Sequence, residues 1–331
     1  MPTLFGEPIF TVERTAYVWD DVVLAAQVWG DWTVLEQRVR DGLTCLARLG
    51  EMDEADEGTL DEADVDAAAT EFRYARDLAA AADLEAWLDR RGITIDAWLD
   101  FIRRSLLLER WADDLDKIRN EYELDDDDVA EAVLCEALCG GVARHLAERL
   151  AARAAIYARG LEEAGAAADV IEPRETMLSR LDATWQRFTA AVAPPDALRK
   201  LIAARRLDWM RVSGRAVVAP NVEVARELML CVREDGRAIE EIAQEAGLRA
   251  ETVEWWLEDA EPSVRDALAG AMPGDVLGPL AWKEAHLVLA VDDKRLPSEG
   301  DALVRARAER ALLARTVDHE VARRVIWRAT L

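Results

Sequence analysis

The chain has 331 residues and a formal net charge of -25 at pH 7, with a sequence pI of about 4.6. The length predicts two or three domains, and 51% hydrophobic with 32% charged residues is typical of a folded globular protein. Such a negative field repels nucleic-acid phosphates and anionic lipid heads, so we expect neither nucleic acid nor a membrane as partner. The charge is compatible with a neutral or basic polypeptide partner, and equally with a role in solubility alone.

The start of the chain, its apolar runs and its cysteines predict a cytoplasmic location. The start, MPTLFGEPIF, lacks the basic and continuous apolar regions of a secretory signal, and charges interrupt every apolar run before membrane-spanning length. The four cysteines are too few and too scattered for a disulfide framework: Cys45, Cys135, Cys139 and Cys231.

Apolar residues recur at three- and four-residue steps through the first two hundred residues, which predicts a helical region. Gly92 is suited to end one helix and Thr94 to begin the next, whereas Gly140-Gly141 predicts a kink or a close helix crossing. We expect one long helix, or a pair broken at Gly30, over 15–49. Further helices are expected at 66–82, 83–91, 95–122, 126–160, 177–192 and 196–206.

Two patterns in this region are candidate metal sites, and neither has a complete set of ligands. The acidic segment 51–66 is centred on Gly58-Thr59. Its carboxylates do not follow the EF-hand order of ligands, with a glycine at the fixed central position of that loop. Cys135, Cys139 and His145 do not share one helix face, and no fourth zinc ligand is evident. We therefore expect no metal and no other cofactor.

From residue 207 the apolar period changes from helical to two, which predicts a small sheet among helices and makes the fold class α+β. The predicted order is strand, helix, helix, strand, helix, strand. The segments are 210–218, 221–232, 239–246, 251–257, 263–271 and 285–291, with a short extended piece at 276–280 before the last strand and a helical tail from 301 to 331.

The stretch 263–297, SVRDALAGAMPGDVLGPLAWKEAHLVLAVDDKRLP, combines a helix, a PGD turn, a GP bend and a histidine-bearing strand. This succession resembles the closing half of a parvulin-type (PpiC-like) peptidyl-prolyl isomerase domain. Earlier, FRYARDL and LEAWLDRRGITIDAWLDFIRRSLL resemble the helical peptide-binding part of SurA-type chaperones. The resemblance implies a helical SurA-like domain at 1–205, a parvulin-like domain at 206–297, and a C-terminal helix at 298–331 that packs back on the helical domain.

Compared with the parvulin pattern, the catalytic residues are largely replaced. His286 lies at the last-strand histidine position, but the first-strand position falls near Gly214 to Ala216, in SGRA, where there is no histidine. Glu251 and Glu254 replace the two glycines of the family's "GDLGWF" motif, and the pocket methionine and phenylalanine are missing from 260–264. The resemblance therefore implies a degenerate isomerase domain.

The candidate site residues follow from these positions. His286 is the catalytic candidate, although a histidine in a small sheet more often has a structural role. The candidate peptide-binding residues are Trp255, Trp256, Trp282, Met210 and Arg215. Core packing is the ordinary role of tryptophan in a strand, and Trp282, in the turn before the last strand, is expected to be the most exposed of the three.

Three functions remain open from the sequence. The first is a peptide-binding chaperone or foldase with a degenerate parvulin domain, whose substrate is a polypeptide or the precursor of a ribosomally made peptide. The second is an active prolyl isomerase that uses His286 and a tryptophan-lined pocket. The third is a peptide-modifying enzyme built on the parvulin frame.

Overall fold

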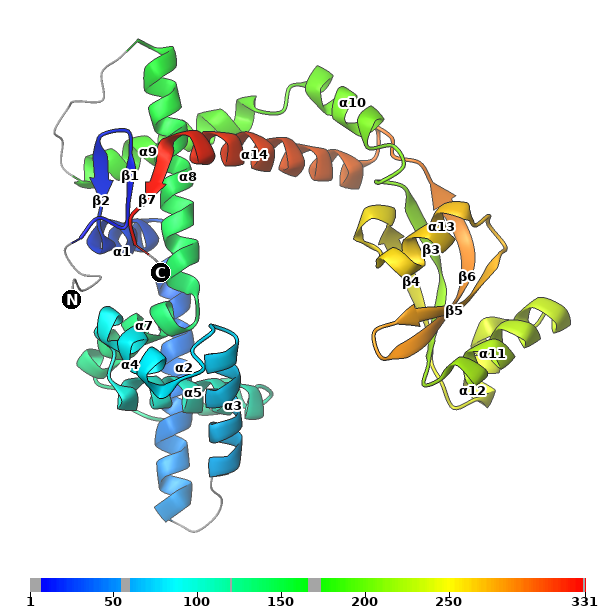
Figure 1. Ribbon diagram of the computed structural model, residues 1–331, viewed down its shortest axis with the longest axis horizontal. Helices are drawn as coiled ribbons and strands as arrows, with labels where there is room; N and C mark the ends of the chain where they lie inside the picture. Colours follow the sequence, from blue (N-terminus) through cyan, green and yellow to red (C-terminus); the bar gives the residue numbers. More distant parts are fainter. Residues whose placement is uncertain (1–6, 55–59, 120, 166–173, 330) are drawn as a thin grey trace. The chain divides into compact units, whose positions relative to one another are not determined.

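The computed structural model describes residues 7–54, 60–119, 121–165, 174–329 and 331, which divide into two compact units (Figure 1). The helical unit comprises Met1–Phe188 with Thr316–Leu331, and the sheet unit comprises Thr189–Arg315. Helices α9 (Arg174–Ala191) and α14 (Ala302–Arg324) each contribute residues to both units. The predicted α+β class is confirmed.

The helical unit is built around α2, which packs against α5 and α7. Its aromatic centre is Phe72, whose ring meets Trp87, Trp98 and Phe101 at centroid distances of 5.6, 5.5 and 6.1 Å. Edge contacts of this kind suit the electron-rich faces of aromatic rings. The helices before α9 are α1 (Trp19–Val28), α2 (Asp31–Glu54), α3 (Glu62–Tyr74), α4 (Ala81–Arg91), α5 (Ile95–Arg110), α6 (Leu115–Ile118), α7 (Asp126–Cys139) and α8 (Val142–Glu163).

The predicted helix ends agree with the structure where glycine or a capping side chain sets them. Gly92 ends α4 at φ 65°, and the Thr94 hydroxyl accepts a hydrogen bond from the Ala97 amide at 3.1 Å. At Gly141, φ is 75°, so the predicted kink is a complete break between α7 and α8. The predicted helix 95–122 is also too long, because α5 ends at Arg110. Gly58-Thr59, the centre of the acidic segment, lies outside the described residues.

A three-stranded sheet in the helical unit was not predicted. It contains β1 (Phe10–Val12), β2 (Thr15–Tyr17) and β7 (Val325–Trp327), in the order β2-β1-β7. The predictions of a helix beginning at residue 15 and of a helical tail to residue 331 are therefore wrong at these strands. Three residues are too few to show an alternating pattern, and β7 is a strand because β1, from the other end of the chain, pairs with it.

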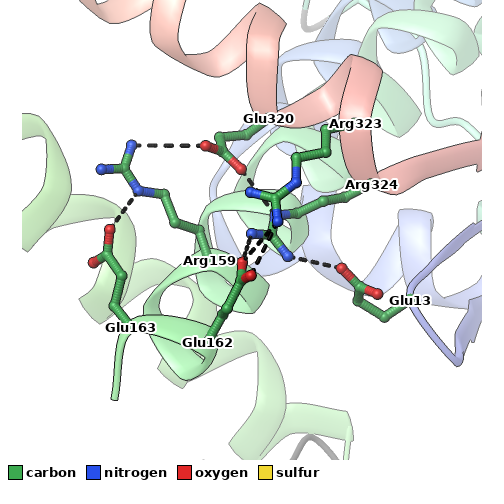
Figure 2. Close-up of polar contacts among 7 residues, drawn as sticks. All are labelled: Glu13, Arg159, Glu162, Glu163, Glu320, Arg323 and Arg324. Carbon is green, nitrogen blue, oxygen red and sulfur yellow. Dashed lines mark hydrogen bonds and ion pairs between the residues drawn. The ribbon is translucent and has the colours of Figure 1, made fainter. Parts of the chain in front are cut away.

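A buried arginine joins the end of α14 to α8 and to the β1–β2 turn (Figure 2). The side chain of Arg324 is 4% exposed, and it donates to Glu13 at 2.7 Å, to Glu320 at 2.8 Å and to Glu162. Burial alone disfavours the charged guanidinium, yet the carboxylates outweigh it and raise the pKa of Arg324. This cluster holds the C-terminal segment in the helical unit.

The sheet unit contains a four-stranded antiparallel sheet with strand order β4-β3-β6-β5 (Figure 1). The predicted order of its elements is confirmed, and His286 lies on β6, an inner strand. After α10 (Pro195–Ala204) come β3 (Arg211–Ala219), α11 (Val222–Asp235), α12 (Ile239–Glu245), β4 (Ala250–Trp256), α13 (Pro262–Gly270), β5 (Val276–Trp282) and β6 (Ala285–Arg295).

The two faces of this sheet bury separate cores. Side chains of successive strand residues point to opposite faces, so Leu287 and Val288 enter different clusters. Leu287 packs with Val264 and Leu268 of α13, and we call this side the α13 face. Val288 packs with residues of α11 and α12, and we call this side the α11 face.

We predict that Arg324→Met lowers the free energy of unfolding by about 2–4 kcal/mol, because it removes the nearer cation, at 2.8 Å, from the buried Glu320 and leaves this carboxylate with the more distant Arg159, at 3.9 Å. Arg323 also pairs with Glu162 but is 52% exposed, so Arg323→Met is the matched control, with an expected cost of at most about 1 kcal/mol. Urea unfolding followed by circular dichroism measures both. Equal losses in the two variants would contradict a structural role of the buried arginine.

The same cluster predicts a loss of stability in acid. Arg324 and Arg323 lower the pKa of Glu162 below its ordinary 4.5. The stabilising effect is therefore present above pH 4.5 and disappears as the pH falls through the lowered pKa. Urea unfolding at a series of pH values should show a smaller acid loss in Glu162→Gln than in the wild type. An identical pH profile in Glu162→Gln would rule this contribution out.

Candidate functional site

Two of the predicted peptide-binding tryptophans come together on the α13 face. The rings of Trp255, at the end of β4, and Trp282, at the end of β5, are stacked with centroids 5.5 Å apart and planes inclined by 22°. These are the two edge strands, and both rings pack against the α13-face core. Strand twist allows opposite corners of one face to approach each other. Both tryptophans are half-buried, so the pair presents aromatic surface beside a packed core.

Met210 belongs to the same core but lies deeper, at 7% exposure. Further half-buried apolar residues of β4 and β5 pack against the same core, and sequence reasoning did not single them out. Strand alternation could have identified two of them, because Val253 is two residues from Trp255 and Leu280 is two residues from Trp282. They include Val253, Leu277 and Leu280.

Trp256 lies on the other side of β4 from Trp255, away from the pair. It packs with Ile202 of α10 and with Trp209 and Val304 in a separate small cluster. The guanidinium of Arg307 lies 4.8 Å from the centre of its ring, in cation–π contact. Trp256 therefore has a packing role in the sheet unit.

His286 and Arg215 lie on the α11 face. His286 is opposite Ala219 of β3, which belongs to the α11-face core, and is two residues from Val288 of the same core. Its Nδ1 is buried and has no hydrogen-bond partner among the described residues. The sheet therefore lies between the imidazole and the tryptophan pair, so these predicted site residues do not form one pocket.

Arg215 has a structural environment of its own. It forms ion pairs with Glu240 of α12 at 3.0 Å and with Asp292 of β6 at 2.6 Å. Burial tends to lower the pKa of Arg215, but the two carboxylates outweigh burial and raise it. Both carboxylate partners lie within the sheet unit, so Arg215 ties α12 to the sheet.

At Gly214 the backbone leaves no room for a side chain. A Cβ built there would lie 2.2 Å from the Ala290 carbonyl oxygen and 3.0 Å from Leu289 Cδ1, at the point where the β3–β6 register shifts. A first-strand histidine at this position would require the backbone to move.

The cysteine and histidine residues considered for zinc are not arranged as a metal site. The Cys135 and Cys139 sulfurs are 3.7 Å apart in the core, whereas His145 is exposed. The hydrogen bond with Cys135, followed by burial, raises the pKa of Cys139, which disfavours a thiolate at Cys139. Within the described ranges no group of three or more His, Cys, Asp or Glu residues is placed to hold a metal ion.

The helical unit has a groove of about 690 Å³ between α2 and the end of α5. Its lining includes Val34, which is 73% exposed, together with Leu108 and Asp41. Asp41 accepts two hydrogen bonds from Arg119, at 2.8 and 2.9 Å, so internal contacts hold this carboxylate.

Comparison with known proteins gives little further information. No protein-family profile and no curated protein matches the chain. One similar solved structure comes from a study of PEB4 and Cj1289 of Campylobacter jejuni, which are described as structurally related SurA-like chaperones. That match has 10% sequence identity and a TM-score of 0.21, and it covers 76% of this chain and 95% of the other. A TM-score this low does not establish a common fold. Among the helices of the described residues, none has both the length and the apolar content to cross a membrane.

We predict that Gly214→Ala destabilises the sheet unit by at least about 2 kcal/mol, because the new methyl group overlaps the Ala290 carbonyl. Gly270, in α13, has nothing within 4 Å of a built Cβ, so Gly270→Ala should be neutral or stabilise by up to about 1 kcal/mol. Urea unfolding of the full chain compares the two. Wild-type stability in Gly214→Ala would show that the strand accepts a side chain there.

Proposed function

We propose that the protein is a polypeptide-binding, chaperone-like protein whose parvulin-like region binds chain segments without isomerising them. The observation that carries this proposal is the half-exposed Trp255–Trp282 stack on the α13 face. Aromatic side chains offer large apolar contact area at a small entropic cost, and their contacts tolerate varied partner sequences.

The separation of His286 from this pair weighs against the isomerase alternative. An isomerase needs its polar groups around the proline that it holds in an apolar pocket. Here the imidazole is on the α11 face, and Gly214 leaves no space for a second histidine at its position on β3. No observation favours the third alternative, a peptide-modifying enzyme.

We also propose a class of substrate, a cellular location and a division into domains. The parvulin resemblance favours the precursor of a ribosomally made peptide, and the net charge of -25 favours one with a basic segment. The four free cysteines are compatible with a reducing cytoplasm. We propose that 206–297 is the substrate-contacting domain, next to a helical domain at 1–205 and a C-terminal helix at 298–331.

The test is binding of a fluorescently labelled, reduced and alkylated protein that cannot fold, measured by anisotropy. Trp255→Ala and Trp282→Ala should each weaken binding about fivefold or more, since buried aromatic contacts dominate such interfaces. The control Trp256→Phe keeps an aromatic ring in its own cluster and should bind as the wild type does.

A protease-coupled tetrapeptide assay decides between binding and isomerisation. We expect no acceleration by the wild type. Isomerase activity that disappears in His286→Ala would overturn the proposal in favour of an enzyme, whereas unchanged binding in both tryptophan variants would remove the observation on which the proposal depends.

A further inference from the structure

Strand β4 is an open edge of the four-stranded sheet. It pairs with β3 on one side, and within the sheet unit no other described strand pairs with its second side. An unpaired strand edge presents a row of free amide and carbonyl groups, which another extended chain can use.

The register identifies which groups point outward. The Leu257 amide donates to the Met210 carbonyl at 2.9 Å, so residue 257 faces β3. In an antiparallel pair this orientation alternates along the strand, so the outward-facing residues are Ala250, Thr252, Glu254 and Trp256. In the described part of the chain, no backbone hydrogen bond outside the ladders of the sheet uses the outward groups of Thr252 or Glu254.

The side chains along this edge are acidic on both faces. Glu251 shares the α13 face with Trp255 and is exposed, and Glu254 projects from the other face with 45% of its side chain exposed. Glu254 has an ion pair with Arg211 at 3.2 Å and still faces solvent. Edge-to-edge pairing with a second copy would bring these carboxylates together in a chain of net charge -25, which is unfavourable.

We propose that the β4 edge accepts an extended polypeptide segment as an added strand, and that the segment alternates apolar with basic residues. Its backbone pairs with Thr252 and Glu254. Apolar side chains on one face of the segment lie beside Val253 and Trp255, and lysine or arginine side chains on the other lie beside Glu254. This inference rests on the proposed function and specifies the chemical class of its substrate.

The test uses the fluorescently labelled peptide Ac-KVKFKVK-amide, its charge-reversed form Ac-EVEFEVE-amide, and the lysine peptide N-methylated at alternate residues, with anisotropy on the full chain. The lysine peptide should bind and the glutamate peptide should not. N-methylation, which removes the donors that a strand needs, should weaken binding at least about fivefold, as expected for lost hydrogen bonds.

The variants test the same edge from the protein side. Thr252→Pro removes an outward amide and leaves the bonds to β3 in place, so it should weaken peptide binding about fivefold or more, whereas Thr252→Val should bind normally. Glu251→Gln with Glu254→Gln should weaken binding and flatten its salt dependence. Glu227→Gln, at an exposed carboxylate of α11, is the control.

Equal binding of the N-methylated and unmodified peptides would overturn the inference, and this comparison does not depend on whether Thr252→Pro folds. The inference would also be overturned if the wild type is a dimer and Thr252→Pro is a monomer, because a second copy of the chain would then occupy the edge. If the edge fails these tests while unfolded protein still binds through Trp255 and Trp282, the proposed function stands without the added strand. Loss of all polypeptide binding in the wild type would overturn both.

Discussion

The pairing of β3 with β6 is the constraint on which the functional account depends. From His286 to Val291 its register places each β6 residue opposite a defined β3 residue, and alternation then assigns each side chain to one face. Leu287 is thereby committed to the core under α13, and His286 to the side of α11 and α12. A shift by one residue would exchange these faces, and the densely packed β6 core makes such a shift costly.

The separation of faces gives the sheet unit two chemically different sides. The α13 face joins an apolar core to a half-exposed tryptophan stack at two strand ends. The α11 face is covered by two helices and crossed by the ion pairs of Arg215. The proposed surface for apolar chain segments, the tryptophan pair, is therefore on the α13 side, and the acidic strand β4 carries one of its two rings.

The sequence predicted the elements of the sheet unit well because its signals are local. Period-two alternation at 210–218 depends on neighbouring residues, as do the Asn221 cap that begins α11 and the left-handed Gly236 that ends it. The helical unit was predicted less well at its ends. The strand at 325–327 exists because it pairs with β1 from the opposite end of the chain, and no local pattern carries that information.

The candidate site was predictable in composition but not in geometry. The tryptophans could be named from their types and positions, yet stacking of Trp255 on Trp282 depends on the twist of strands that are not neighbours. The exclusion of a side chain at Gly214 depends on the Ala290 carbonyl across the sheet. Such cross-strand distances are tertiary properties.

Hydrogen–deuterium exchange of the full chain, with and without an unfoldable polypeptide, tests the central claim most directly. The account predicts that bound polypeptide slows exchange in 250–256 and 276–282 and leaves the α11 and α12 amides unchanged. Protection confined to α11 and α12, or to the helical unit, would contradict it.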